Sequence, residues 1–213
     1  MNNPLVQPAQ SNPIGTPAEV LVFWLGDALQ SDWPAQNRSP LWFGGGAEQD
    51  RQIAERFGAL VNLALAGGLE AWEENLPSRL ALILLLDQFT RHVYRGQARA
   101  FAGDGRAQQL VLRTLEAGGD VLLPRVGRVF LYMPLMHAEH LDLQESCVHR
   151  FAQLVADAPP ALQPTLANHL KFAREHRDIV AAHGRFPHRN AALGRSTTPA
   201  EEEFLKNGPR YGQ

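Results

Sequence analysis

The stretch PSRLALILLLDQFTRHVYRG, residues 77–96, decides the fold. Pro77 suits the first turn of a helix, and residues 80–89 are apolar around almost the whole helical circumference. A helix that is apolar on nearly all sides must be buried, so we expect this segment at the centre of the fold. The most apolar run, residues 80–86, is far shorter than the roughly 20 residues that span a membrane.

Further helices are expected on both sides of this segment. The tetrapeptide Thr-Pro-Ala-Glu occurs at residues 16–19 and 198–201, and each copy is a capping box that predicts a helix beginning near residue 17 or 199. Apolar residues recur with helical period in residues 48–64. A helix beginning at Pro124, with a continuation past Gln144, should be kinked or broken at Pro134. The other predicted helices are residues 99–116, 143–156 and 162–183.

No run of four or more residues alternates apolar and polar side chains as a strand requires. The sequence therefore predicts an all-α fold of about eight helices, stacked as antiparallel helical hairpins. No repeat of the 34-residue tetratricopeptide period is visible. We expect a disordered N-terminal tail over residues 1–15 and one all-helical domain over residues 16–213.

Composition limits the function. The chain has 213 residues, of which 45% are hydrophobic and 20% charged, as in ordinary globular domains. Its single cysteine, Cys147, excludes an internal disulfide and a metal site made of several thiolates. A net charge of −2 gives no basic excess for nucleic acid or an anionic membrane. The first residues lack the charged and apolar regions of a signal peptide, so we expect a cytoplasmic protein.

Asp87 and Arg91 are the first polar residues that point to chemistry. They are four residues apart on the central helix, so their side chains share the stripe that carries Ile83 and Leu84. One interpretation is a buried ion pair that fixes helix packing, since buried charges are normally paired. The other is an anion clamp in which Asp87 holds Arg91, with Arg95 one turn further on.

Histidines form two further patterns. His137 and His140 would share a helical stripe and could bind a metal, but the usual zinc spacing on a helix is i, i+4, so we expect no metal site and keep this pair as a weak candidate. His169, His176 and His183 recur every seven residues, about 10 Å apart on a helix. One metal ion cannot be bound by that stripe, which leaves hydrogen bonds between helices or a histidine that faces a pocket.

A donor-rich loop follows Gly184. It carries Arg185, His188, Arg189 and Asn190, and loops of this kind often hold functional residues. Residues 171–195 have six basic and two acidic side chains, a local charge of +4 with neutral histidines, which could attract a carboxylate or phosphate. Alternatively, the loop caps carbonyl groups and forms salt bridges with a neighbouring helix.

A distinctive set of residues is spread along the chain: Trp42, Phe43, Asp50, Ile53, Phe57, residues 85–89, Arg91, Arg95, Gly96, residues 99–101, Tyr132, Pro134, Met136, His137, Glu139, residues 176–178 and residues 184–194. In these residues the sequence resembles the bacterial domain-of-unknown-function 924 family from Thr16 to about Gly208. Thr90, His92 and His140 depart from the proline, asparagine and aspartate usual there. The resemblance implies an all-helical, tetratricopeptide-like superhelix and carries no reaction or catalytic residues.

Three hypotheses for the function remain open. The first is a pocket between helices that binds a small anion-bearing metabolite, because polar groups interrupt otherwise apolar stripes. The second is a hydrolase with His137 or His188 as general base and arginines that stabilise negative charge. The third is a scaffold for a protein or peptide. We expect no tightly bound cofactor, no nucleic-acid or membrane partner, and a homodimer would be unsurprising. The predicted pocket residues are Trp24, Asp87, Gln88, Arg91, His137, His140, Arg185, His188, Arg189 and Asn190.

Overall fold

The computed structural model describes residues 15–211, which are all-helical as predicted and contain no strand. The expected disordered tail falls outside the described residues, apart from Gly15. The ten α-helices are α1 (Pro17–Leu25), α2 (Ala28–Ser31), α3 (Ala47–Leu65), α4 (Leu76–Ile83), α5 (Thr90–Val93), α6 (Asp104–Glu116), α7 (Arg125–Met136), α8 (Leu141–Ala156), α9 (Gln163–His183) and α10 (Pro199–Asn207). Two of them, α2 and α5, have only four residues, and they raise the number above the expected eight.

Both predicted capping boxes are present. The backbone N–H of Thr16 donates to Glu19 at 2.7 Å, and that of Thr198 donates to Glu201 at 2.8 Å. These bonds satisfy N–H groups that have no partner inside a helix. Helices α1 and α10 therefore begin where the sequence places them.

The central helix is also confirmed, with one change. Helical structure runs without a break from α4 through α5, and every residue from 80 to 90 is buried. Its middle turn and a half, η3 (Leu84–Phe89), is a π-helix, which the apolar pattern does not indicate. Such turns carry one extra residue per turn and are often found at functional sites. Asp87 and Gln88 lie in this segment.

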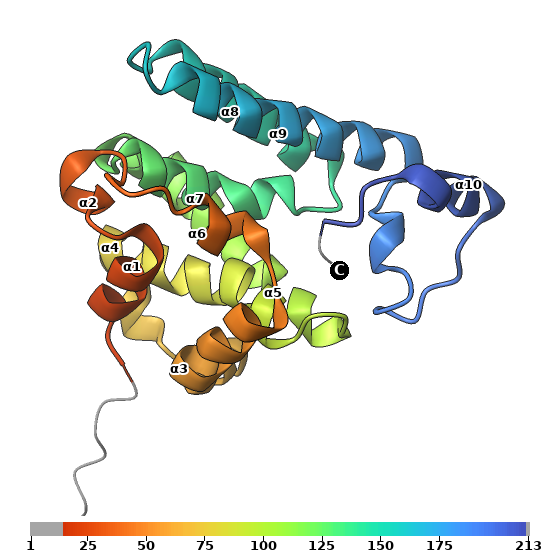
Figure 1. Cartoon of the computed structure of the whole chain (residues 1–213), viewed down its shortest axis with the longest axis horizontal. Helices are drawn as coiled ribbons and strands as arrows, with labels where there is room; N and C mark the ends of the chain where they lie inside the picture. The colour runs from red at the N-terminus through yellow and green to blue at the C-terminus, as the bar shows by residue number, and fades with distance from the viewer. Residues whose placement is uncertain (1–14, 212–213) are drawn as a thin grey trace, which may run out of the picture.

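Helices α8 and α9 form a long antiparallel hairpin along one side of the molecule, and α10 lies beyond the end of α9 (Figure 1). Elsewhere, helices pack on elements distant in the chain: α1 contacts α4, and α3 contacts η3 and α5. Repeat proteins instead pack each unit on its neighbours in sequence. The structure thus supports the all-α class and does not confirm a tetratricopeptide-like superhelix.

The predicted continuation of α7 past Gln144 is wrong. The helix passes through Pro134 and ends at Met136, so His137 is its C-terminal cap and His140 is the N-terminal cap of α8. Gln144 closes the gap, because its Nε2 donates to the carbonyl oxygens of Met136 at 2.6 Å and Ala138 at 2.7 Å. The expected helical stripe of His137 and His140 therefore does not exist.

Most of the buried apolar residues form a large cluster and a small one. The large cluster extends from Val20 in α1 to Ala173 in α9. The small cluster contains Ile179, Val180 and Phe186, with Phe204 packed against it. Within residues 15–211, no helix is both long and apolar enough to cross a membrane.

Candidate functional site

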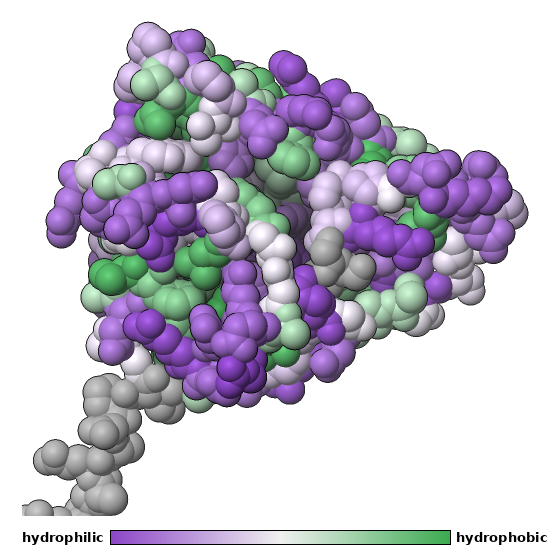
Figure 2. Space-filling view, in the orientation of Figure 1, coloured by the Kyte–Doolittle hydropathy of each residue, from purple (hydrophilic) through white to green (hydrophobic). Residues whose placement is uncertain are grey.

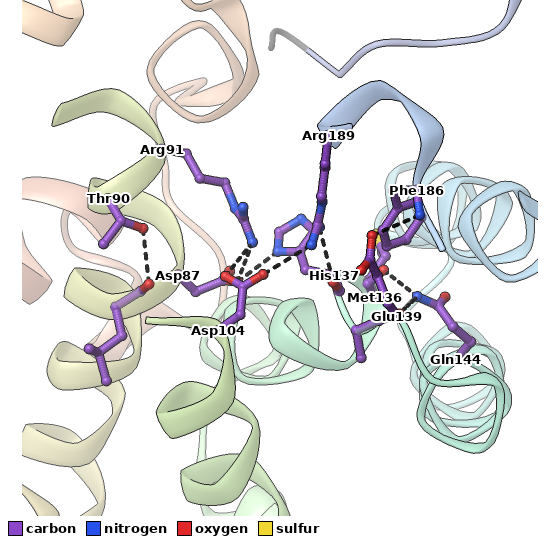
Figure 3. Close-up of polar contacts among 12 residues, drawn as sticks. Asp87, Thr90, Arg91, Asp104, Met136, His137, Glu139, Gln144, Phe186 and Arg189 are labelled. Carbon is purple, nitrogen blue, oxygen red and sulfur yellow. Dashed lines mark hydrogen bonds and ion pairs between the residues drawn. The ribbon is translucent and has the colours of Figure 1, made fainter. Parts of the chain in front are cut away.

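Five charged or polar side chains from different elements meet at the end of the central helix (Figure 3). Asp87 comes from η3, Arg91 from α5 and Asp104 from the first turn of α6. His137 caps α7, and Arg189 lies in the 3-10 helix η6 (Pro187–Arg189). We call these five residues the charged cluster.

Positive and negative groups alternate in this cluster. Arg91 Nη2 lies 3.1 Å from Asp87 Oδ1 and 2.9 Å from Asp104 Oδ1. Arg189 Nη1 donates to Asp104 Oδ2 at 3.1 Å, and its Nη2 donates to the carbonyl of His137 at 2.9 Å. The predicted Asp87–Arg91 pair is therefore present, as one link in a longer network.

His137 and Asp87 form a hydrogen-bonded dyad. His137 Nδ1 lies 2.7 Å from Asp87 Oδ1, and Gln88 Nε2 donates to Asp87 Oδ2 at 2.5 Å. Burial raises the pKa of Asp87, but His137 and Arg91 outweigh it and hold that pKa well below its usual range. Burial lowers the pKa of His137 despite the nearby carboxylate. The dyad therefore consists of a carboxylate and a neutral imidazole at pH 7, with the proton on Nδ1.

A second carboxylate, Asp50 of α3, binds His92 of α5 and Arg95, which lies two residues past the end of α5. Arg95 Nε lies 2.6 Å from Asp50 Oδ2, and His92 Nδ1 lies 2.8 Å from Asp50 Oδ1. Burial raises the pKa of Asp50, but the hydrogen bonds from Arg95 and His92 have the larger effect. The pKa of Asp50 is therefore below its usual value. Burial also lowers the pKa of His92.

The charged cluster and the group formed by Asp50, His92 and Arg95 border a cavity of about 540 Å³. The space-filling view shows a recess between the N-terminal body and the C-terminal part of the chain, with polar and apolar surface around it (Figure 2). The cavity is lined by Trp42, Phe43, Gly44, Gly45, Gln88, Arg91, His92, Arg95, Met133, Met136, His137, Asn168, His169, Phe172, His176 and Tyr211.

Helix α9 contributes two of the three evenly spaced histidines to this wall. Burial lowers the pKa of His169 to about 4 and that of His176 to about 3, so both are neutral at pH 7. The His176 ring stacks on Tyr211 with 4.0 Å between ring centroids. His183 instead packs against Phe204 of α10.

The structure brings together about half of the predicted pocket residues. Gln88, Arg91 and His137 line the cavity. Asp87 and Arg189 lie in the charged cluster, where they contact these lining residues or their backbone. His188 is half-buried beside Tyr211, with 5.5 Å between ring centroids, and burial lowers its pKa to about 3.

The remaining four predicted residues lie neither on the cavity wall nor in the charged cluster. Trp24 is fully buried in the core, and His140 is exposed at the start of α8. Arg185 and Asn190 both bind Glu201, at 2.6 Å and 3.2 Å, and so fix α10 against the loop. The alternative interpretation of this loop, salt bridges to a neighbouring helix, accounts for Arg185, and Asn190 adds a hydrogen bond to the same carboxylate.

The sequence-based pocket omits several lining residues, including Trp42, Phe43, His169 and Tyr211. Trp42 and Phe43 lie in a short π-helix, η1 (Pro40–Gly44), within a segment that the glycines mark only as a loop. The seven-residue histidine spacing could have indicated His169 and His176, because both fall on the buried face of α9.

No group of three or more His, Cys, Asp or Glu side chains within residues 15–211 is arranged to hold a metal ion. In the weak metal candidate, His137 Nδ1 is directed to Asp87, and His140 is the N-terminal cap of the next helix, α8. Cys147 is fully buried, and burial raises the pKa of its thiol. Its sulfur contacts the carbonyl of Tyr132 at 3.7 Å.

Fold and site define an all-α protein with a buried ion-pair network behind a cavity rich in arginine and histidine. A family model described as bacterial protein of unknown function (DUF924) matches residues 20–209, so the chain belongs to this family. A solved structure of a protein of unknown function from Agrobacterium tumefaciens is similar, with 35% identity and a TM-score of 0.71. The match covers 90% of this chain and 97% of that one. No curated protein matches the chain.

Proposed function

We propose that the protein binds a small anion-bearing molecule in this cavity. The observation that carries the proposal is the lining itself: Arg91, Arg95 and four histidines reach the wall, and none of the described lining residues is acidic. The volume of about 540 Å³ is in the range of small-molecule sites. Aromatic and methionine side chains supply the apolar part of the wall.

The two arginines are held in place before a ligand arrives. Asp87 and Asp104 anchor Arg91, and Asp50 anchors Arg95. Both carboxylate bonds of Arg91 use Nη2, and its Nη1 has no acceptor among the described residues. A guanidinium has five N–H donors, so Arg91 keeps hydrogen-bonding capacity for an anion.

Thermal denaturation in the presence of ligands tests this proposal. We expect small carboxylates to raise the melting temperature, because they bind only the folded state, and the matching primary amides to have no effect. Arg95→Gln should abolish the shift, whereas Arg99→Gln, on the exposed surface, should retain it. Equal shifts with acids and amides would contradict anion binding. As a separate measurement, native mass spectrometry of protein purified from its own host would identify a retained molecule.

No observation supports a scaffold for a protein or peptide as directly as the cavity lining supports an anion site. The exposed large apolar side chains are distributed over different elements, including Val22 in α1, Leu63 in α3 and Leu112 in α6. Phe43 and Phe172 are also exposed, but they line the cavity. Apolar contacts therefore support a ligand in this cavity more directly than a partner protein on another surface.

A further inference from the structure

We propose that His137, oriented by Asp87, is a general base that activates water in this cavity, and that the protein hydrolyses esters carrying a carboxylate. This inference rests on the proposed anion site, since Arg95 would bind the carboxylate of the ester. Arg91, which shares Asp87 Oδ1 with His137, lies where it can stabilise the oxyanion that forms.

The hydrogen bonds fix the tautomer of His137. Asp87 is fully buried and accepts bonds from His137 Nδ1, Gln88 Nε2 and Arg91 Nη2. The proton of the imidazole therefore lies on Nδ1, and the lone pair is on Nε2. No described residue donates a hydrogen bond to Nε2, and the side chain lines the cavity.

The backbone at His137 is fixed as well. Arg189 donates to the carbonyl of His137 at 2.9 Å and is bound in turn by Asp104 at 3.1 Å. Its guanidinium also lies over the rings of Phe101 and Phe186, 4.7 Å and 4.5 Å from their centroids. Arg189 is thus a positioning residue that fixes the end of α7 and, with it, the imidazole.

The protonation state agrees with this role. Burial lowers the pKa of His137, the positive charge of Arg91 lowers it too, and Asp87 opposes both. At neutral pH the imidazole can therefore accept a proton. A general base must be deprotonated before it acts, so the sign of the shift favours catalysis at pH 7.

Water is the nucleophile that the lining permits. None of the described lining residues is serine, threonine or cysteine. Cys147 is buried beneath Tyr132, and its thiol pKa is raised, so it is not an activated nucleophile. A base that acts on water needs no nucleophilic side chain.

The proposed reaction balances in two steps. His137 Nε2 removes a proton from water while the water oxygen bonds to the ester carbonyl carbon, and the carbonyl electron pair moves to the oxygen near Arg91. The tetrahedral intermediate then expels the alcohol oxygen, which takes the proton from His137. The products are a carboxylic acid and an alcohol, and the imidazole is neutral again.

Two chromogenic esters of matched length test the proposal with the full chain. Mono(4-nitrophenyl) adipate carries a carboxylate, and 4-nitrophenyl hexanoate does not. We expect hydrolysis of the adipate ester above the buffer rate and a much lower rate for the hexanoate ester. His137→Gln should reduce the rate about 100-fold or more, the usual contribution of a general base. His149→Gln, on the exposed side of α8, is the control and should be unchanged.

The pH dependence of the hydrolysis rate of the unmodified protein gives a second test, which does not depend on whether the His137→Gln variant folds. The rate should rise with pH as His137 loses its proton, and then level off. A rate independent of pH, or an unchanged rate in His137→Gln, would overturn the proposed base.

The outcomes separate this inference from the function on which it rests. If the adipate ester raises the melting temperature but is not hydrolysed, the general base is overturned and anion binding stands. If both esters are hydrolysed equally and His137→Gln loses both activities, the base stands and carboxylate recognition is overturned. If the adipate ester has neither effect, both proposals are overturned.

Discussion

Arg189 shows how a single residue connects the site to the rest of the chain. It is buried, and burial lowers its pKa to about 10, which still leaves it charged at neutral pH. Asp104 accepts a bond from it, and so does the carbonyl of His137. Removing one partner from a buried ion pair leaves the other charge without compensation, and this is expensive in free energy.

Arg189→Ala should lower the free energy of unfolding by about 3 kcal/mol, because Asp104 keeps only Arg91 and two aromatic contacts are lost. Urea denaturation measures this change. Arg51→Ala is the control, since Arg51 forms salt bridges with Glu48 and Glu55 while its side chain remains 60% exposed. That variant should change stability by less than about 1 kcal/mol, and equal losses in the two variants would contradict the argument.

At the scale of elements, the π-helical segment η3 and the start of α6 fit closely against each other. Gly103, the N-terminal cap of α6, lies so close to η3 that an added Cβ would be 2.3 Å from the carbonyl oxygen of Leu86. The same oxygen accepts a hydrogen bond from the Thr90 hydroxyl at 2.9 Å. This contact helps to set the distance between Asp104 and Arg91, and hence the geometry of the charged cluster.

Gly103→Ala should therefore destabilise the protein by about 1–3 kcal/mol, since a backbone carbonyl cannot rotate away from the new methyl group. Gly105→Ala, two residues later in α6, is the matched control because nothing lies within 4 Å of its added Cβ. It should leave stability unchanged or raise it by about 0.5 kcal/mol, since alanine favours a helix more than glycine does. Similar midpoints of unfolding for the two variants would contradict the proposed close fit.

At the scale of the whole molecule, four buried or half-buried histidines from three segments line the cavity or lie beside one of its lining residues. His137 comes from the end of α7, His169 and His176 from α9, and His188 from η6. Burial lowers the pKa of each of them. The folded protein therefore keeps these side chains neutral at a pH at which the unfolded chain protonates them.

Stability should consequently fall as the pH falls below about 6.5, the ordinary histidine value. The unfolded chain binds more protons than the folded chain in this range, so acid favours unfolding until the folded-state pKa values are reached. Each such histidine contributes about 1.4 kcal/mol per pH unit to the slope between its two pKa values.

His169, with a pKa of about 4, tests this directly. His169→Gln should reduce the slope of the free energy of unfolding against pH by about 1.4 kcal/mol per pH unit between pH 6 and pH 4.5. This change corresponds to about one proton. Urea denaturation at several pH values measures the slope, with His149→Gln as the control. An unchanged slope in His169→Gln would show that His169 is protonated in the folded state.

The sequence by itself determined the all-α class, both capping boxes, the buried central helix and the Asp87–Arg91 pair. These features depend on residues within about one or two turns of one another, and helical period and capping express such local relations directly. The end of α7 was less predictable, because Gln144 stabilises the break after Met136 with two side-chain bonds to carbonyl oxygens that neither helical period nor a capping motif indicates.

Tertiary structure alone decided which side chains form the site. His137 meets Asp87 across 50 residues of sequence, and Arg189 meets Asp104 across 85. Pairing at such separations depends on how whole helices pack, and a one-residue change such as the π turn in η3 alters which faces meet. The same packing placed Trp42 on the cavity wall and directed Arg185 to α10, because no local signal in either segment specifies its distant partner.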